Sequence, residues 1–175
     1  ALFPNVYFLG DDRIRGKFSY AACSSQMIAS QTSKQKMEYV RRALQGYRYL
    51  GVRDTATEKL VRAAFPEAVL HHNCDPTVLL DLNALPFTLE RVREKLQAAG
   101  IDLTRPIIGL MGDDNIGRLI RTLFGNEYQV VAVYANTRYA DCYLDDLRPL
   151  EWARVFSLFS ITFTRFFHGT MLSLK

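Results

Sequence analysis

The segment RFFHGTMLSLK, residues 165–175, places a histidine and a glycine where an apolar run meets a helical pattern. Residues 161–164 are apolar and β-branched enough for a short strand, and Gly169 and Thr170 can begin the helix that follows. The amides at the start of a helix attract anions, and an imidazole can exchange protons near neutral pH. The pattern therefore predicts an anion site with His168 beside it as a proton carrier. The alternative is a structural histidine that only makes hydrogen bonds.

A second candidate is GVRD at residues 51–54, which ends another short apolar run. An arginine at the carboxyl end of a parallel strand offers a planar group of donors to a carboxylate or a phosphate. Arg53 is therefore a candidate substrate ligand, and Thr55 or Thr57 can cap the helix that follows. The competing interpretation is a surface ion pair between Arg53 and Asp54, which would contribute only ~0–1 kcal/mol.

Three further motifs are less specific. HHNCDP, residues 71–76, has adjacent histidines that would point to opposite faces of a strand, so no metal site is predicted there. MGDDNIG, residues 111–117, lies where a phosphate loop would begin, but its aspartates would repel phosphate, and Asn115 is expected to cap a helix. Residues 134–147 could bind a sugar or form an ordinary surface loop. The side chains that would contact a sugar there are Tyr139, Asp141, Tyr143, Asp145 and Asp146.

The composition favours a soluble globular protein. The 175 residues are 49% hydrophobic, enough for one good core or two small ones. No apolar stretch approaches the roughly 20 residues of a membrane helix, and no signal peptide is visible, so a cytoplasmic location is expected. The net charge is +4, but the basic residues are scattered, which argues against nucleic acid as a partner. The three cysteines lie far apart and are expected to be reduced thiols.

Short apolar runs predict strands that alternate with helices. The strands are expected at residues 6–9, 17–22, 49–52, 68–71, 107–111, 129–134 and 161–164. Helices are expected to begin at Thr88 and Pro149 and to cover residues 116–124, where apolar side chains repeat every three and four positions. This alternation is typical of α/β proteins with Rossmann-like parallel sheets covered on both faces.

The chain is expected to contain two such units. Residues 1–85 are interpreted as the latter part of an N-terminal Rossmann-like domain, residues 86–104 as a connecting helix, and residues 105–175 as an incomplete C-terminal Rossmann-like domain. The sequence begins in an apolar run and stops about two turns into a helix. We therefore expect residues to be missing at both ends.

Taken in order, several motifs resemble the polysaccharide pyruvyl transferase family. They are YAA at residues 20–22, GVRDTATEKL at 51–60, DP at 75–76, LEW at 150–152 and FFHGTMLSLK at 166–175. The resemblance implies a glycosyltransferase-B-like architecture of two Rossmann-like domains, with the site in the cleft between them. It also implies that phosphoenolpyruvate donates its enolpyruvyl group to two hydroxyls of a glycan or lipid-linked sugar, leaving a pyruvate ketal and phosphate.

By that resemblance, Arg53 and Arg165 would bind phosphoenolpyruvate, and His168 would carry a proton to the methylene carbon or from a sugar hydroxyl. Gly169 and Thr170 would donate hydrogen bonds to the departing phosphate. Some family members place an arginine two residues before the histidine, whereas Arg165 lies three residues before His168.

No metal ion or cofactor is predicted. Two alternatives stay open, a nucleotide-sugar-dependent glycosyltransferase of the same architecture and a non-catalytic glycan-binding module.

Overall fold

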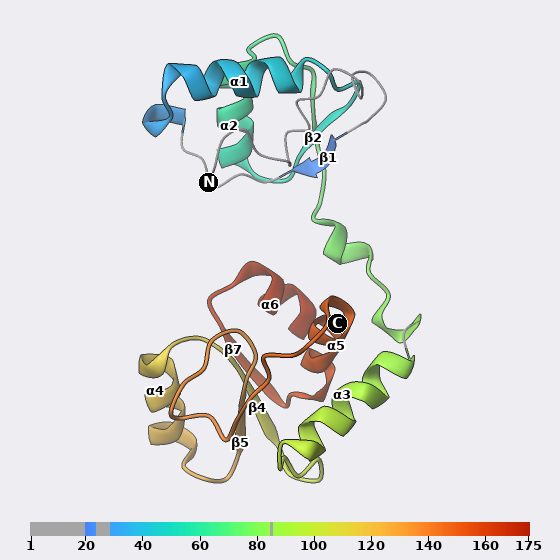
Figure 1. Cartoon of the computed structure of the whole chain (residues 1–175), viewed down its shortest axis with the longest axis vertical. Coiled ribbons are helices and arrows are strands. Elements are labelled where there is room, and N and C mark those ends of the chain that lie inside the picture. Colours follow the sequence, from blue (N-terminus) through green and yellow to red (C-terminus); the bar gives the residue numbers. More distant parts are fainter. Residues whose placement is uncertain (1–19, 24–28, 85) are drawn as a thin grey trace. The chain divides into compact units, whose positions relative to one another are not determined.

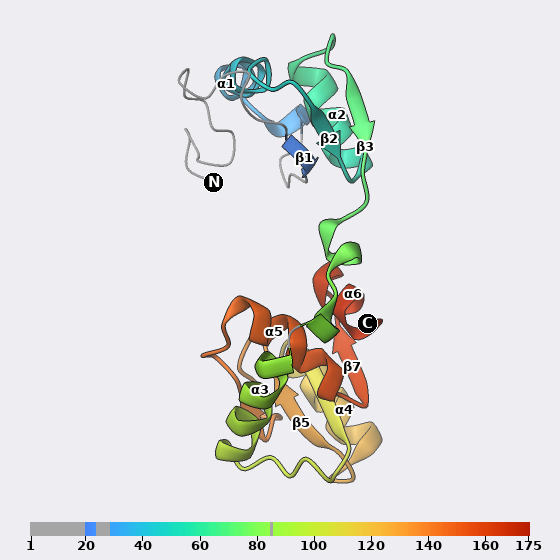
Figure 2. The same cartoon turned by 90° about the vertical axis from the view of Figure 1, so that its right-hand side faces the viewer.

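The structure, a computed structural model, describes residues 20–23, 29–84 and 86–175. The chain divides into two compact units, Ala1–Val78 and Leu79–Lys175. Each unit contains a parallel sheet whose strands are joined by helices, except for the loop between β5 and β6 of the second unit (Figures 1 and 2). The predicted α/β class with parallel sheets is confirmed. The strand expected at residues 6–9 lies outside the described residues.

The first unit has a three-stranded sheet in the order β1-β2-β3. Its strands are β1 (Tyr20–Cys23), β2 (Leu50–Val52) and β3 (Leu70–His72). Its helices are the 3-10 turn η3 (Ala29–Gln31), α1 (Lys34–Leu44), α2 (Thr55–Ala64) and the 3-10 turn η4 (Pro76–Leu79), which runs into the second unit. All three residues of β2 are buried, and Val52 packs with Val40 and Val61 in the core. The GVRD motif therefore begins on a buried central strand.

The second unit has a four-stranded parallel sheet in the order β6-β5-β4-β7. Its strands are β4 (Ile107–Met111), β5 (Gln129–Ala132), β6 (Cys142–Tyr143) and β7 (Ile161–Thr164). Its helices are η5 (Leu82–Ala84), α3 (Pro86–Ala98), α4 (Asp114–Phe124), α5 (Pro149–Val155), η6 (Phe156–Leu158) and α6 (Phe167–Ser173). The predicted bounds of β4 and β7 are confirmed, whereas β6 was not predicted.

Alternate residues of β4 pack on opposite faces of this sheet. Ile107 and Met111 belong to the core under α3, α5 and α6, whereas Ile108 and Leu110 pack against α4 (Figures 1 and 2). The period of two follows from the strand geometry.

Helix α3, which was expected to connect two domains, is instead part of the second unit, because its Val92 and Leu96 are fully buried in that core.

The strand order changes direction between β4 and β7. From β4 the chain continues through α4 to β5 and then to β6, and it returns through α5 to place β7 on the other side of β4. Ligands of open parallel sheets bind outside the carboxyl ends of the strands at such a switch point. The segments that follow β4 and β7 are therefore the first place to look for a site.

Gly109, in the middle of β4, accommodates the ring of Phe159. A Cβ at this position would lie 2.7 Å from Cγ of Phe159 and closer still to two other ring carbons. The ring is held edge-to-face against Phe156, with 5.7 Å between the ring centres. We expect Gly109→Ala to lower the free energy of unfolding by ~1–3 kcal/mol, measured by urea denaturation. Adding Phe159→Leu should recover part of this loss, and unchanged stability of the single variant would contradict the packing.

Lys95 of α3 forms ion pairs with two carboxylates, Asp146 just before α5 and Glu151 in its first turn. Its Nζ lies 2.8 Å from Oδ2 of Asp146 and 3.1 Å from Oε2 of the buried Glu151. The pKa of Glu151 is lowered from 4.5, first because the backbone amide of Arg148 donates to the carboxylate; burial raises the pKa, and Lys95 lowers it further. The pKa of Lys95 is raised, chiefly by its hydrogen bond to Asp146.

These shifts predict how acid affects the second unit. A carboxyl whose folded pKa lies below its unfolded value stabilises the fold above the unfolded pKa, and that contribution is lost as the pH falls through the folded pKa. The difference in unfolding free energy between the parent and Glu151→Gln should therefore be constant above about pH 4.5 and shrink below it. Urea denaturation across that range is the measurement. A difference that persists in acid would show that Glu151 does not stabilise the fold through its charge.

Candidate active site

His168 lies just outside the carboxyl end of β7. Helix α6 begins at Phe167, so His168 is its second residue, and its side chain is exposed. The imidazole contacts the ring of Phe167 edge-to-face, with 5.5 Å between the ring centres. Because β7 borders the switch point, an exposed imidazole here can exchange protons with a molecule bound at the carboxyl edge of the sheet.

Helix α6 begins earlier than the sequence indicated, and this changes the interpretation of Thr170. Its backbone amide donates to the carbonyl of Phe166 at 3.1 Å, and its hydroxyl donates to the same oxygen at 3.3 Å. These donors already serve the helix, so the hydrogen bonds of Thr170 do not support its expected role as a phosphate ligand.

Gly169 is buried where α6 packs closely against the ends of β4 and β7. A Cβ at this position would lie 2.5 Å from Sδ of Met111 and 2.5 Å from Oγ1 of Thr164. The glycine therefore lets α6 pack directly on the ends of β4 and β7. Its amide lies in the first turn of the helix, where the donors have no acceptor one turn earlier in the same helix.

Arg165, which follows β7, forms an ion pair with Asp113, which follows β4. Nη1 of Arg165 lies 3.4 Å from Oδ2 of Asp113, and the guanidinium lies 5.4 Å from the ring centre of Phe166. The two charged side chains are 59% and 47% exposed, so the pair contributes only ~0–1 kcal/mol and can be exchanged for a ligand. Asp113 also accepts hydrogen bonds from the amides of Asn115 and Ile116. The helix cap expected at Asn115 is therefore wrong; Asp113 is the cap.

In the first unit, Arg53 follows β2 and forms an ion pair with Asp75, which follows β3. The side chain of Asp75 is 3% exposed and that of Arg53 is 24% exposed. Asp75 also accepts a hydrogen bond from the amide of Thr77 at 2.8 Å. A guanidinium carries five donors in one plane, so the group can contact Asp75 and an anion at the same time. The pair therefore orients the Arg53 guanidinium at the carboxyl edge of this sheet, while Asp75 offsets part of its charge.

The other residues of the GVRD motif are structural. Asp54 accepts a hydrogen bond from the amide of Thr57 at 2.7 Å and is the N-cap of α2. The caps expected at Thr55 or Thr57 are therefore wrong, and the observed ion pair of Arg53 is with Asp75. From the sequence, Asp75 was noted only within the HHNCDP motif and as the DP of the family resemblance, without a partner. An acid before a proline, three residues after the end of the short strand β3, was the available signal.

The two adjacent histidines of β3 have different partners. His71 stacks on Tyr49, with ring centres 4.4 Å apart, and Nε2 of His72 lies 3.4 Å from Oε2 of Glu58. The pKa of Glu58 is lowered, first by its hydrogen bond from Arg62. Within residues 20–23, 29–84 and 86–175, no three His, Cys, Asp or Glu side chains are grouped so that they could hold a metal ion.

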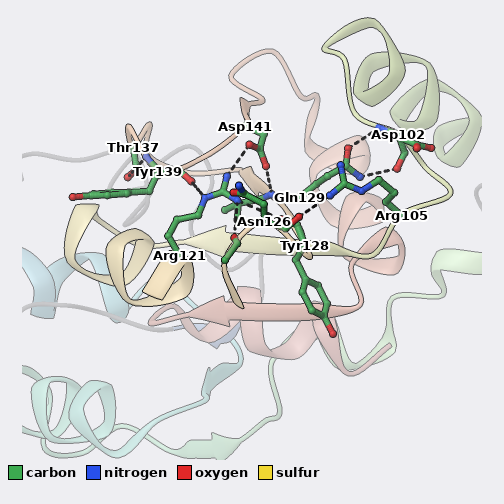
Figure 3. A network of polar contacts seen from close by, with 11 residues as sticks. Asp102, Arg105, Arg121, Asn126, Tyr128, Gln129, Thr137, Tyr139 and Asp141 are labelled. Atoms are coloured by element: carbon green, nitrogen blue, oxygen red, sulfur yellow. Dashed lines mark hydrogen bonds and ion pairs between the residues drawn. The ribbon is translucent and has the colours of Figure 1, made fainter. Parts of the chain in front are cut away.

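Figure 3 shows the hydrogen bonds that connect the loop after β5 to Arg121 of α4. Nε of Arg121 donates to the carbonyl of Tyr139 at 2.9 Å, and its Nη2 donates to Oδ1 of Asp141 at 2.7 Å. The other carboxylate oxygen of Asp141 accepts a hydrogen bond from the amide of Val130 at 2.7 Å. Asp141, one of the expected sugar contacts, is thus a structural residue, and Asp146 is held by Lys95.

A family model for polysaccharide pyruvyl transferase matches residues 12–175. The chain belongs to the polysaccharide pyruvyl transferase family. The matched range contains Arg53 of the first unit and the β7–α6 junction of the second. Searches of curated proteins and of solved structures returned no match.

Membership of the polysaccharide pyruvyl transferase family indicates transfer of a pyruvyl group to a glycan. The candidate residues remain His168 and Arg165 in the second unit and Arg53 in the first, each described within its own unit. In the part of the chain that the structure describes, no helix is long and apolar enough to cross a membrane.

Proposed function

We propose that this family member takes phosphoenolpyruvate as its donor and forms a pyruvate ketal on a sugar of a polysaccharide or its precursor. The observation that carries the proposal is the position of His168, an exposed imidazole at the switch point of the second sheet. The family match supports the pyruvyl transfer itself. We further propose that the two units correspond to the Rossmann-like domains of a glycosyltransferase-B-like enzyme, because each has a parallel sheet with helical crossovers.

The reaction neither consumes nor releases a net proton apart from the one that leaves with the phosphate. One sugar hydroxyl adds to the central carbon of phosphoenolpyruvate while the methylene carbon gains a proton and becomes a methyl group. The second hydroxyl then forms its bond to the same carbon as the carbon–oxygen bond to phosphate breaks, and its proton leaves with the phosphate. The products are the ketal and inorganic phosphate, with no oxidant or metal required by the balance.

His168 is the proton carrier in this proposal. An imidazole can take a proton from a hydroxyl or give one to the methylene carbon, and such transfers typically contribute ~10²–10⁴-fold to a rate. Arg165, three residues earlier, would contact the phosphate or carboxylate of the donor after leaving Asp113. Arg53, oriented by Asp75, supplies the second positive group.

The test is phosphate release from phosphoenolpyruvate by the protein in the presence of a panel of acceptor glycans. We expect release only with an acceptor, and mass spectrometry of that acceptor should show an added carboxyethylidene group. Omitting the acceptor is the control for simple hydrolysis. If the protein turned over a nucleotide sugar and released no phosphate from phosphoenolpyruvate with any acceptor, the proposal would be overturned in favour of a glycosyltransferase.

A further inference from the structure

An aromatic surface lies at the carboxyl edge of the second sheet, beside the candidate active site. It consists of Tyr134, Phe166 and Phe167. Tyr134 and Phe167 are 56% and 55% exposed, and Phe167 contacts the imidazole of His168. The rings of Tyr134 and Phe166 meet with their centres 4.3 Å apart and an angle of 49° between their planes. Because Tyr134 follows β5 and Phe166 follows β7, this contact passes over the end of β4.

The backbone on both sides of this surface is held in place. The amide of Val133 donates to Leu110 of β4 at 3.1 Å, and its carbonyl accepts from the indole nitrogen of Trp152 at 3.2 Å. Phe166 packs against the main core, and its amide donates to the Thr164 hydroxyl at 3.0 Å. Tyr134 therefore presents an exposed ring from a fixed position, which is the property of a preformed binding surface.

The chemistry of this surface suits a neutral sugar better than the anionic donor. The face of an aromatic ring is electronegative, so it repels phosphate and carboxylate and attracts the weakly positive hydrogens on the C–H face of a pyranose. The carboxylates of Asp113 and Asp114, 47% and 53% exposed, lie at the end of β4 and can accept hydrogen bonds from hydroxyls. The arrangement combines a stacking ring with acceptors for hydroxyl groups.

From this geometry we infer that Tyr134 and Phe166 form the acceptor subsite, with the Tyr134 ring stacking on the sugar that receives the pyruvyl group. The inference rests on the proposed function, because that function supplies the sugar. It goes further in assigning the acceptor to the β5 side of the switch point, across the end of β4 from the β7–α6 junction that carries His168. Tyr134 is a binding residue in this assignment, so its loss should affect the acceptor and leave the donor unaffected.

The test has a binding readout that does not depend on turnover. Saturation-transfer difference NMR with the methyl glycosides of glucose, galactose and mannose should show transfer to ring C–H protons of at least one sugar. Tyr134→Ala should abolish this signal, and Tyr134→Phe should retain it. Leu123→Ala is the matched control, because Leu123 is a large apolar side chain that is 63% exposed at the end of α4.

Phosphate-release kinetics provide the second readout. Tyr134→Ala should raise the acceptor KM by about 10-fold while the KM for phosphoenolpyruvate stays within about twofold of the parent value. Sugar signals that depend on Tyr134, found without any release of phosphate from phosphoenolpyruvate, would support the subsite and count against the donor. Uridine diphosphate is added to the NMR panel as a nucleotide probe. The subsite is overturned if Tyr134→Ala leaves both readouts unchanged or if no glycoside of the panel gives a signal. It is also overturned if uridine diphosphate is the only compound that gives a signal.

Discussion

Replacing His168 by alanine should reduce acceptor-dependent phosphate release by about 10²- to 10⁴-fold, the usual contribution of a positioned proton carrier. The imidazole is exposed at the start of α6, so the substitution should change the free energy of unfolding by no more than ~0.5 kcal/mol. The loss should therefore appear in kcat, with unfolding by urea unchanged. Steady-state kinetics and denaturation of the same preparations are the two measurements.

Two comparisons separate proton transfer from a structural role of His168. Added imidazole should restore part of the activity of His168→Ala, because the position is open to solvent. His168→Gln, which keeps a hydrogen-bonding group but cannot carry a proton near neutral pH, should stay as slow as the alanine variant. His72→Ala is the matched control, since that histidine is 64% exposed and lies on β3. Activity of His168→Ala close to that of the parent would eliminate His168 as the proton carrier.

Replacing Arg53 by alanine should both weaken donor binding and destabilise the first unit. Loss of a charge-assisted contact to the phosphate or carboxylate would raise the KM for phosphoenolpyruvate by about 10- to 100-fold. The same change removes the ion-pair partner of Asp75, whose side chain is 3% exposed. We expect a loss of ~3 kcal/mol in unfolding free energy, at the lower end for a broken buried pair because Arg53 is itself 24% exposed.

A double variant distinguishes these two effects of Arg53. In Arg53→Met with Asp75→Asn, both charges are removed together, and the asparagine can still accept the hydrogen bond from the Thr77 amide. Much of the stability should return, because no buried carboxylate has lost its counter-charge, but the KM for phosphoenolpyruvate should remain high. If the KM for phosphoenolpyruvate of the double variant returned to the parent value together with its stability, Arg53 would act only on the fold. Arg62→Ala is the control, since Arg62 is 52% exposed and pairs within α2.

The regular elements near the candidate site follow from local sequence patterns. The apolar runs at β4 and β7 and the repeat along α4 were enough to predict these elements, because side chains two residues apart on a strand, and three or four apart on a helix, share one buried face. Helix starts were less well predicted. Asp113 and Asp54 are the caps where Asn115 and a threonine were expected, since neighbouring polar residues can each accept the same amide hydrogens.

The composition of the site depended on the tertiary structure. His168 and Arg53 could be selected from the sequence, because each follows a recognisable apolar strand. The contacts from Arg53 to Asp75, from Arg165 to Asp113 and from Tyr134 to Phe166 could not. Each of them joins the ends of different strands, so it exists only once the order β1-β2-β3 or β6-β5-β4-β7 is set. Strand order depends on which apolar faces pack together across the whole unit, and local periodicity carries no information about that choice.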